Sequence, residues 1–169
     1  MNIEMITGYF GTYGLFAVFV IVFLEYLNLP GFPAGIIMPL AGVMAASGHN
    51  GFVLTLLVST AAGILGSEML YVLGRFGGKA FDALVDRCFS KQKDKVEKCR
   101  LWISDRGPVG VFVAKLLPAV RTLVSIPAGM VRMNPVSYTI SSALGVLIWN
   151  AVFVGAGYFF GDAVLRILL

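Results

Sequence analysis

Residues 114–134 read AKLLPAVRTLVSIPAGMVRMN. The stretch is apolar enough to lie in a lipid bilayer, yet its interior combines cations with prolines: Lys115, Arg121, Pro118 and Pro127. Proline interrupts a helix because its nitrogen carries no hydrogen and its ring clashes with the preceding turn. A continuous spanning helix would not combine buried cations with several breakers. We therefore predict a helical hairpin whose tip lies near Arg121.

The composition around this stretch is that of an integral membrane protein. Of 169 residues, 58% are hydrophobic and 13% are charged, and the mean hydropathy is +0.86. Ordinary soluble domains carry about twice that share of charge. The first Lys or Arg is Arg75. The early apolar run therefore lacks the basic start of a signal peptide, and we expect it to be kept as a span.

Long apolar runs and breaker-rich segments alternate along the chain. Apolar runs of about 20 residues predict about three full transmembrane helices, within 1–29, 51–74 and 135–169. Prolines and glycines crowd two further segments, which we predict to be re-entrant helical hairpins that enter and leave the membrane on one side, at 30–50 and 108–134. The expected fold class is all-α and integral to the membrane, with one domain over 1–169.

The segment 75–107 carries the whole excess of positive charge. Nine basic residues stand against five acidic ones between Arg75 and Arg106. A short basic segment between apolar ones stays on the cytoplasmic side of a membrane, which sets the expected orientation. Apolar residues recur at helical spacing among the charges, which predicts one or two amphipathic helices at the membrane surface. A solvated connecting helix is the alternative.

Two other readings of the segment 75–107 have little support. Its acids are interspersed with its bases and its aromatic residues are few, unlike a nucleic-acid-binding surface. In a helix, Cys88 and Cys99 would lie on nearly the same face but about 16 Å apart along the axis, too far for a disulfide. We expect free thiols in a reducing compartment.

Catalytic and metal-binding motifs are missing from the sequence. It has no Ser-His-acid set, no HExxH, no Walker loop and no cluster of metal ligands, and its one histidine is His49 in a turn-like SGHNG stretch. We therefore predict that the chain is not an enzyme and that it has no catalytic residue, metal or cofactor.

The two breaker-rich segments echo each other. Pro39 is followed by LAGVM at 40–44, and Pro127 is followed by AGMV at 128–131, each ahead of a long apolar helix. With the basic segment inside, the two hairpins would open from opposite faces of the membrane. Such an inverted repeat places a transport site at paired interrupted segments near the midplane. Glycines in the last span favour close helix packing and leave a homo-oligomer open.

Four charged residues of the apolar segments are the candidates for charges buried in the bilayer: Glu25, Glu68, Lys115 and Arg121. A charge in the bilayer costs roughly 2.5–3.5 kcal/mol on insertion scales, so each needs a partner or a wet cavity. They could neutralise one another if the hairpins meet. The alternative is that they lie at the interfaces and extend their charged ends to water.

An interfacial position fits Arg121 poorly, because this residue lies where the hairpin tip is expected. Broken helix ends leave backbone N–H groups unpaired, and a guanidinium beside them makes a strong phosphate site. A lipid headgroup that carries phosphate would suit this arrangement.

The sequence resembles the DedA family of bacterial membrane proteins, which shares the VTT domain with eukaryotic lipid scramblases. The resemblance is carried by FLEYLNLPGFPAG and PLAG within 23–42, GSEMLYVLGRFGG at 66–78, KLLPAVRTLVSIPAGMVRMNPVSY at 115–138 and GVLIWNAVFVGAGYFFG at 145–161. It implies a transporter that moves phosphate-bearing lipids, undecaprenyl phosphate or phosphatidylethanolamine, across the bacterial cytoplasmic membrane.

The resemblance also implies roles for single residues. Glu25 matches the family's acid in the first span, and Arg121 matches the second of its two arginines. Lys115 stands where the first arginine is usual, which keeps the charge but loses the two-pronged guanidinium. Gly35 replaces an acid to which proton coupling would be assigned. Glu68 lies one position beyond the place of another acid.

We therefore expect a lipid flippase or scramblase whose partners are the bilayer and a lipid with a phosphate headgroup. The expected substrate-binding or transport residues are Glu25, Pro33, Gly35, Glu68, Lys115, Pro118, Arg121, Thr122, Pro127, Gly129, Trp149 and Asn150. Two alternatives stay open: a proton-coupled transporter of small ions, and a membrane scaffold that transports nothing.

Overall fold

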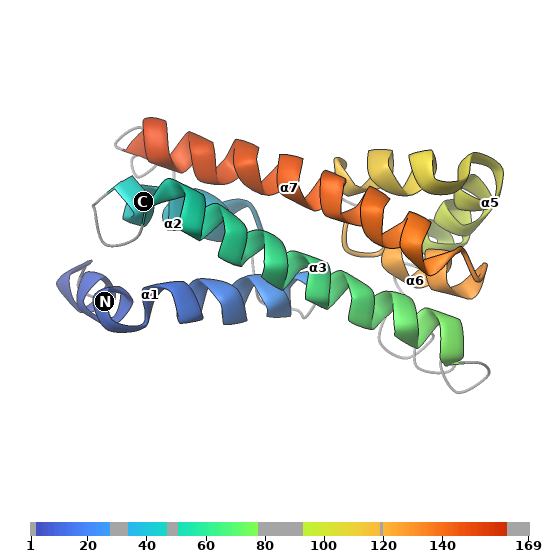
Figure 1. Ribbon diagram of the computed structural model, residues 1–169, viewed down its shortest axis with the longest axis horizontal. Coiled ribbons are helices and arrows are strands. Elements are labelled where there is room, and N and C mark those ends of the chain that lie inside the picture. The colour runs from blue at the N-terminus through green and yellow to red at the C-terminus, as the bar shows by residue number, and fades with distance from the viewer. Residues whose placement is uncertain (1–2, 28–33, 47–50, 78–92, 119, 162–169) are drawn as a thin grey trace. The chain divides into compact units, whose positions relative to one another are not determined.

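The computed structural model describes residues 3–27, 34–46, 51–77, 93–118 and 120–161, and these ranges contain helices and turns but no strand. Figure 1 shows the helices in chain order by colour. They form two compact units, each described by itself below. Unit 1 comprises Met1–Gly63 with Leu147–Leu169, and unit 2 comprises Ile64–Val146.

Two helices contribute to both units. Helix α3, Phe52–Phe76, and helix α7, Pro135–Phe159, each have 25 residues and are apolar and long enough to cross a membrane. Helix α7 begins with a standard cap, because Asn134 Oδ1 accepts hydrogen bonds from the backbone N–H groups of Val136 and Ser137 at 3.0 and 3.3 Å. Two of the expected spans thus have suitable helices.

The first expected span falls in helix α1, Ile3–Tyr26, which contacts helix α2, Ala34–Ala46. The part Gly14–Tyr26 is apolar but shorter than a full span. Phe19 and Phe23 stack along α1 with ring centroids 6.2 Å apart. A full crossing of the membrane by α1 stays a prediction.

Helix α2 crosses α7 within unit 1 through two glycines. A Cβ at Gly42 would overlap the carbonyl oxygen of Val154, and one at Gly157 would overlap the carbonyl oxygen of Pro39. Only glycine allows backbones to come this close, and in lipid such contacts replace the missing hydrophobic drive between helices. Next to this crossing, Phe52 contacts the ring of Tyr158 at a centroid distance of 5.3 Å.

Unit 2 repeats this arrangement with other helices. Helix α6, Ser125–Met130, crosses α3: a Cβ at Gly129 would overlap the carbonyl oxygen of Tyr71, and one at Gly74 that of Ile126. In unit 1, Gly42 lies three positions after Pro39, and Gly157 lies three positions after Val154. The spacing is the same in unit 2, where Gly74 follows Tyr71 and Gly129 follows Ile126 by three positions. The sequence echo around LAGVM and AGMV therefore corresponds to equivalent packing.

Helix α5, Lys93–Lys115, bends at Gly107, whose φ of 56° and ψ of −135° lie outside the helical region. Pro108 follows the bend, where its missing N–H group costs no helical hydrogen bond. Before the bend, Cys99 and Ile103 are buried one turn apart while Lys98 and Arg100 are exposed. The amphipathic helix expected in the basic segment is present over 93–106, and its apolar face packs on protein. Burial there raises the pKa of the Cys99 thiol, which is free.

The two predicted hairpins have different outcomes. In 108–134, the second part of α5 ends at Lys115, turns occupy 116–118 and 120–124, and α6 follows, so the described residues form a helix–turn–helix, whose re-entry into a membrane stays a prediction. In 30–50, residues 34–46 form one helix that continues through Pro39, although that proline removes the hydrogen bond to the Gly35 carbonyl. The described part of this segment therefore shows no turn, and the re-entrant hairpin over 30–50 stays a prediction. Pro33 and the ends of this segment lie outside the described residues.

The turn from α6 to α7 contains Arg132 with φ of 52°, a left-handed conformation that glycine normally adopts. The Arg132 N–H donates to the Gly129 carbonyl at 2.9 Å, and the Met133 N–H donates to the Ala128 carbonyl at 3.2 Å. These two bonds define a Schellman motif. An arginine at this position is strained, so something other than stability favours it.

Glycine at the α2–α7 crossing should be essential to stability. We expect Gly157→Ala to lower the free energy of unfolding by about 1–3 kcal/mol, because the new Cβ cannot fit against Pro39. Gly155→Ala is the matched control, since a Cβ there meets nothing within 4 Å, and it should be neutral or stabilising. Thermal unfolding in one detergent measures both. Equal effects of the two substitutions would contradict the crossing.

Relief of the strained turn should stabilise unit 2. We expect Arg132→Gly to raise the free energy of unfolding by about 0.5–1 kcal/mol, because glycine adopts a positive φ without strain. Arg132→Asn should gain less and Arg132→Val should lose stability, in that order. Thermal unfolding of the four proteins gives the ranking, and a valine variant as stable as the glycine variant would refute it.

Candidate functional site

Lys115 lies at the end of α5 and is 1% exposed. Its Nζ donates hydrogen bonds to Ser67 Oγ of α3 at 2.7 Å and to Ser125 Oγ of α6 at 3.0 Å. Both serines are themselves buried. One ammonium group therefore connects three helices of unit 2, and the bonds also fix its position inside the unit.

Polar groups from α3 and α7 surround this ammonium. Tyr138 is buried and its hydroxyl donates to the Ser67 carbonyl at 3.1 Å. Thr139 Oγ1 donates to Glu68 Oε1 at 2.7 Å. Glu68 is half-buried and its carboxylate attracts Lys115 electrostatically. The structure thus brings together Lys115 and Glu68, two of the four charges singled out in the sequence.

Arg121 lies in the turn between α5 and α6 and is also 1% exposed, the largest of the fully buried side chains. The backbone N–H groups of Val120 and Arg121 both donate to the Leu117 carbonyl, at 3.2 and 3.0 Å. The Val124 N–H donates to the Val120 carbonyl at 2.9 Å. These donors, expected to be free for an anion, are used within the turn. These backbone groups are therefore not available to bind an anion.

The other site residues of the second hairpin lie around Arg121. Pro118 is exposed, Thr122 is half-buried, and Pro127 and Gly129 are buried in α6. Pro127 is the third residue of that helix, where its N–H would have no partner within the helix. Gly129 makes the crossing with α3. These residues shape the hairpin, and Thr122 offers a hydroxyl beside Arg121.

Two stacked tyrosines fix the base of the site. Tyr71 and Tyr138 stack with centroids 4.3 Å apart and planes 14° apart. The Tyr71 hydroxyl donates to the Met133 carbonyl, and Arg75 Nη1 donates to the Tyr71 hydroxyl at 2.7 Å and to the Met133 carbonyl at 2.8 Å. The α6–α7 turn is thereby held against α3 at Met133.

Sequence reasoning missed four contributors to this site: Ser67, Ser125, Tyr138 and Thr139. In the sequence, each of these residues appears only as a hydroxyl-bearing side chain within an apolar helix. Taken alone, such a residue is common in membrane helices, where it also bonds across helix interfaces. Only the folded unit shows that two of these hydroxyls accept hydrogen bonds from the same ammonium.

The remaining described site residues belong to unit 1. Glu25 is 4% exposed, and the neighbouring Tyr26 hydroxyl donates to Asn150 Oδ1 at 3.3 Å. Asn150 is fully buried, and Trp149 stacks on Phe153 with centroids 4.5 Å apart. The Trp-Asn pair of α7 therefore lies in the interior. Gly35 is in α2, and Pro33 is outside the described residues.

The described residues include no group of three or more His, Cys, Asp or Glu that could hold a metal ion. The candidate site in unit 2 offers two buried cations, several hydroxyls and the carboxylate of Glu68. Such a set can bind and release an anion.

Comparison with known proteins finds relatives along most of the chain. It is 32% identical over 151 residues to "Undecaprenyl phosphate transporter A" of Staphylococcus aureus, which covers 87% of this chain and 74% of that protein. It is 29% identical over 164 residues to an "Alkaline phosphatase-like protein" of Lactococcus lactis, covering 94% and 76%. It is 28% identical over 163 residues to "Protein DedA" of Escherichia coli, covering 94% and 73%. No solved structure matches significantly.

The family comparison agrees with these relatives and with the all-helical fold. The model of the VTT domain matches residues 32–159, which include α2, α3, α5, α6 and α7. The chain therefore belongs to the DedA family of VTT-domain membrane proteins.

Proposed function

We propose that this protein moves a lipid with a phosphate headgroup across the bacterial cytoplasmic membrane, and that Lys115 and Arg121 bind the phosphate. The observation that carries the proposal is the burial of both cations in unit 2, each 1% exposed. Among the described residues of that unit, they are the charged side chains that are buried.

The charge balance in unit 2 favours an anion. A buried cation is costly, and such groups in membrane proteins generally serve a substrate path. Ser67 and Ser125 orient the Lys115 ammonium but carry no charge to neutralise it. Glu68 is only half-buried and also bonds to Thr139. A phosphate next to Lys115 and Arg121 would be attracted by both cations.

The two equivalent helix crossings support an inverted repeat. The short helix α2 precedes α3 in sequence but crosses α7, and α6 precedes α7 but crosses α3. Two halves that exchange partners in this way are expected from a repeated unit. We propose that the two breaker-rich segments are re-entrant, with the basic segment 75–107 in the cytoplasm, so that they approach the midplane from opposite faces.

Undecaprenyl phosphate is the preferred substrate. Two relatives, from Staphylococcus aureus and Bacillus subtilis, are named undecaprenyl phosphate transporters. The lipid carries one phosphate, whose charge two cations can balance. Phosphatidylethanolamine is the second substrate to test, since its headgroup phosphate would meet the same cations.

A proton-coupled carrier is the second candidate, and Glu25 is the observation that favours it. This carboxyl is 4% exposed within an apolar helix, where a proton can bind or leave as the surroundings change. Transport that is unaffected by an imposed proton gradient would remove this candidate.

Arg121 should be needed for transport. In liposomes, we expect Arg121→Gln to slow undecaprenyl phosphate exchange by about tenfold or more, because charge-assisted hydrogen bonds contribute roughly 1.5–3 kcal/mol. Arg121→Lys should lie between, since it keeps the charge and loses the fork. Arg106→Gln is the matched control, because that side chain is exposed at 62%.

Thermal unfolding of each variant separates loss of fold from loss of function. The same assay with phosphatidylethanolamine ranks the two substrates. Exchange at the wild-type rate by a folded Arg121→Gln protein would eliminate Arg121 from the mechanism.

A further inference from the structure

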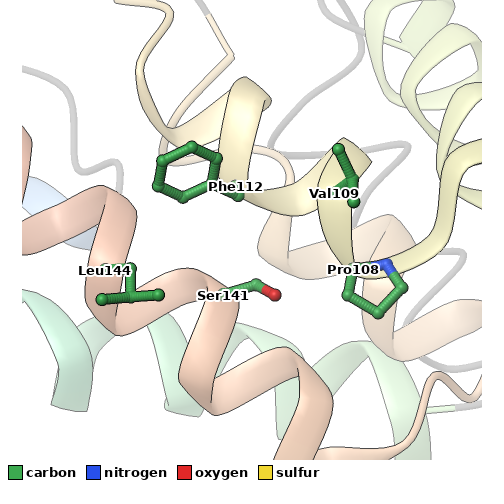
Figure 2. A pocket seen from close by; sticks show the side chains of 5 residues that line it. All are labelled: Pro108, Val109, Phe112, Ser141 and Leu144. Atoms are coloured by element: carbon green, nitrogen blue, oxygen red, sulfur yellow. The ribbon is translucent and has the colours of Figure 1, made fainter.

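Unit 2 has a surface groove that the proposed phosphate site does not use. Its volume is about 240 Å³, and it is lined by Pro108, Val109, Phe112, Ser141 and Leu144. Figure 2 shows the first three residues on α5 at one side of the groove and the last two on α7 at the other. Ser141 supplies the only polar side chain among these lining residues.

The bend of α5 shapes this groove. Gly107 changes the direction of the helix just before Pro108, and Phe112 follows Pro108 by one turn on the same face. Ser141 and Leu144 are likewise one turn apart on α7. The groove therefore runs along the seam between the two helices, with an apolar wall on each side.

The seam ends at the proposed phosphate site. At Gly145, next to Leu144, an added Cβ would lie 2.5 Å from Lys115 Cβ and 3.3 Å from the Phe112 carbonyl oxygen. Helices α5 and α7 are thus in close contact where Lys115 begins. Lys115 follows Pro108 by seven positions, which is about 10 Å along a helix. An apolar groove is therefore joined to a buried cation.

We propose that this groove binds the hydrocarbon chain of the transported lipid, in the part next to its headgroup. This inference rests on the proposed function, because Lys115 is taken to bind the phosphate. An amphiphile has the complementary pattern, with a negative group at one end and an apolar chain that follows. Val109 and Leu144 are 64% and 50% exposed, so the chain can enter from the side where a membrane protein meets lipid.

The dimensions of the groove favour a single chain over a helix of a second copy. A helix with its side chains is about 10 Å wide and one turn of it advances about 5.4 Å, which fills far more than the available volume. A hydrocarbon chain is a few ångströms wide. The walls also lack charged groups that a protein partner could pair with.

The groove can be filled without a change at the phosphate site. In Ser141→Trp, the indole occupies the groove from α7. Val136→Trp is the matched control, because this residue is on the same helix, 66% exposed and outside the groove. Leu144→Ala is a second variant, which enlarges the groove and removes packing from the chain. Thermal unfolding confirms that each purified full-length protein is folded.

Two probes separate the chain from the headgroup. Undecaprenyl phosphate carries both the chain and the phosphate headgroup. Methyl phosphate carries the headgroup alone, and its binding is measured by competition with undecaprenyl phosphate in the same detergent. Ser141→Trp and Leu144→Ala should weaken undecaprenyl phosphate binding by roughly three- to tenfold, a modest change because the chain exchanges one apolar environment for another. Methyl phosphate should compete for these two variants as well as it competes for the wild-type protein. Val136→Trp should change neither, and Arg121→Gln should weaken both.

The possible results discriminate between the two proposals. If Ser141→Trp weakens both probes equally or neither, the groove does not bind the chain and only this inference falls. If the wild-type protein binds neither probe, the phosphate site fails and the groove proposal fails with it. If Val109→Cys forms disulfide-linked dimers that undecaprenyl phosphate does not suppress, the groove holds a second copy and the inference is overturned.

Discussion

The constraint on which unit 2 depends is the need to hold an ammonium group away from water. Lys115 has a long apolar stem, and its charged end requires acceptors at hydrogen-bond distance wherever it is buried. Ser67 and Ser125 provide them from α3 and α6, so the charge can be buried only when both helices are in place. The stacked tyrosines and the bonds from Arg75 and Tyr71 to Met133 then hold α7 and the α6–α7 turn against α3. Polar contacts thereby specify how the helices of this largely apolar unit pack.

Glycine crossings explain how helices can associate in lipid, where the surroundings are as apolar as the helix side chains. Close backbone approach at Gly42 with Gly157, and at Gly129 with Gly74, increases dispersion contacts and places Cα–H groups near carbonyl oxygens. The same pattern in both units means that one solution is used twice along the chain. Helix α2 crosses α7, and helix α6 crosses α3. Each crossing therefore needs one helix from each half of the sequence. The two halves are therefore interdependent, although the sequence echo between them is short.

Much of the fold could be predicted from composition and from the spacing of breakers. The long helices, the turn near Arg121 and the family were predictable because bilayer thickness, proline chemistry and recurring motifs leave strong local signals. The continuity of α2 through Pro39 was not, since tertiary contact at Gly42 compensates for a lost hydrogen bond that local reasoning treats as a break. The hydroxyl partners of Lys115 were not predictable either. Ser67 and Ser125 are far apart in sequence, and their helices meet only in the folded unit, where they cross at Gly74 and Gly129. Backbone donors predicted to be free at Arg121 are used in the turn because turns bond internally whenever geometry allows.

Hydroxyl acceptors for Lys115 also bear on how a carrier must release what it binds. A lysine locked to a carboxylate at short range would have to break that ion pair for each phosphate that arrives, and a site with several fixed cations would hold the phosphate too tightly to let it go. In the proposed mechanism, two serines avoid both extremes, because neutral acceptors fix the ammonium in place without forming an ion pair with it. Glu68 is shared with Thr139 and only half-buried, so it would moderate the attraction for a phosphate. A lysine at this position would act in the same direction, since a point charge binds phosphate less specifically than a guanidinium fork does. Transport requires binding strong enough to extract the headgroup from water and weak enough to release it on the other side, as in other conduction pathways.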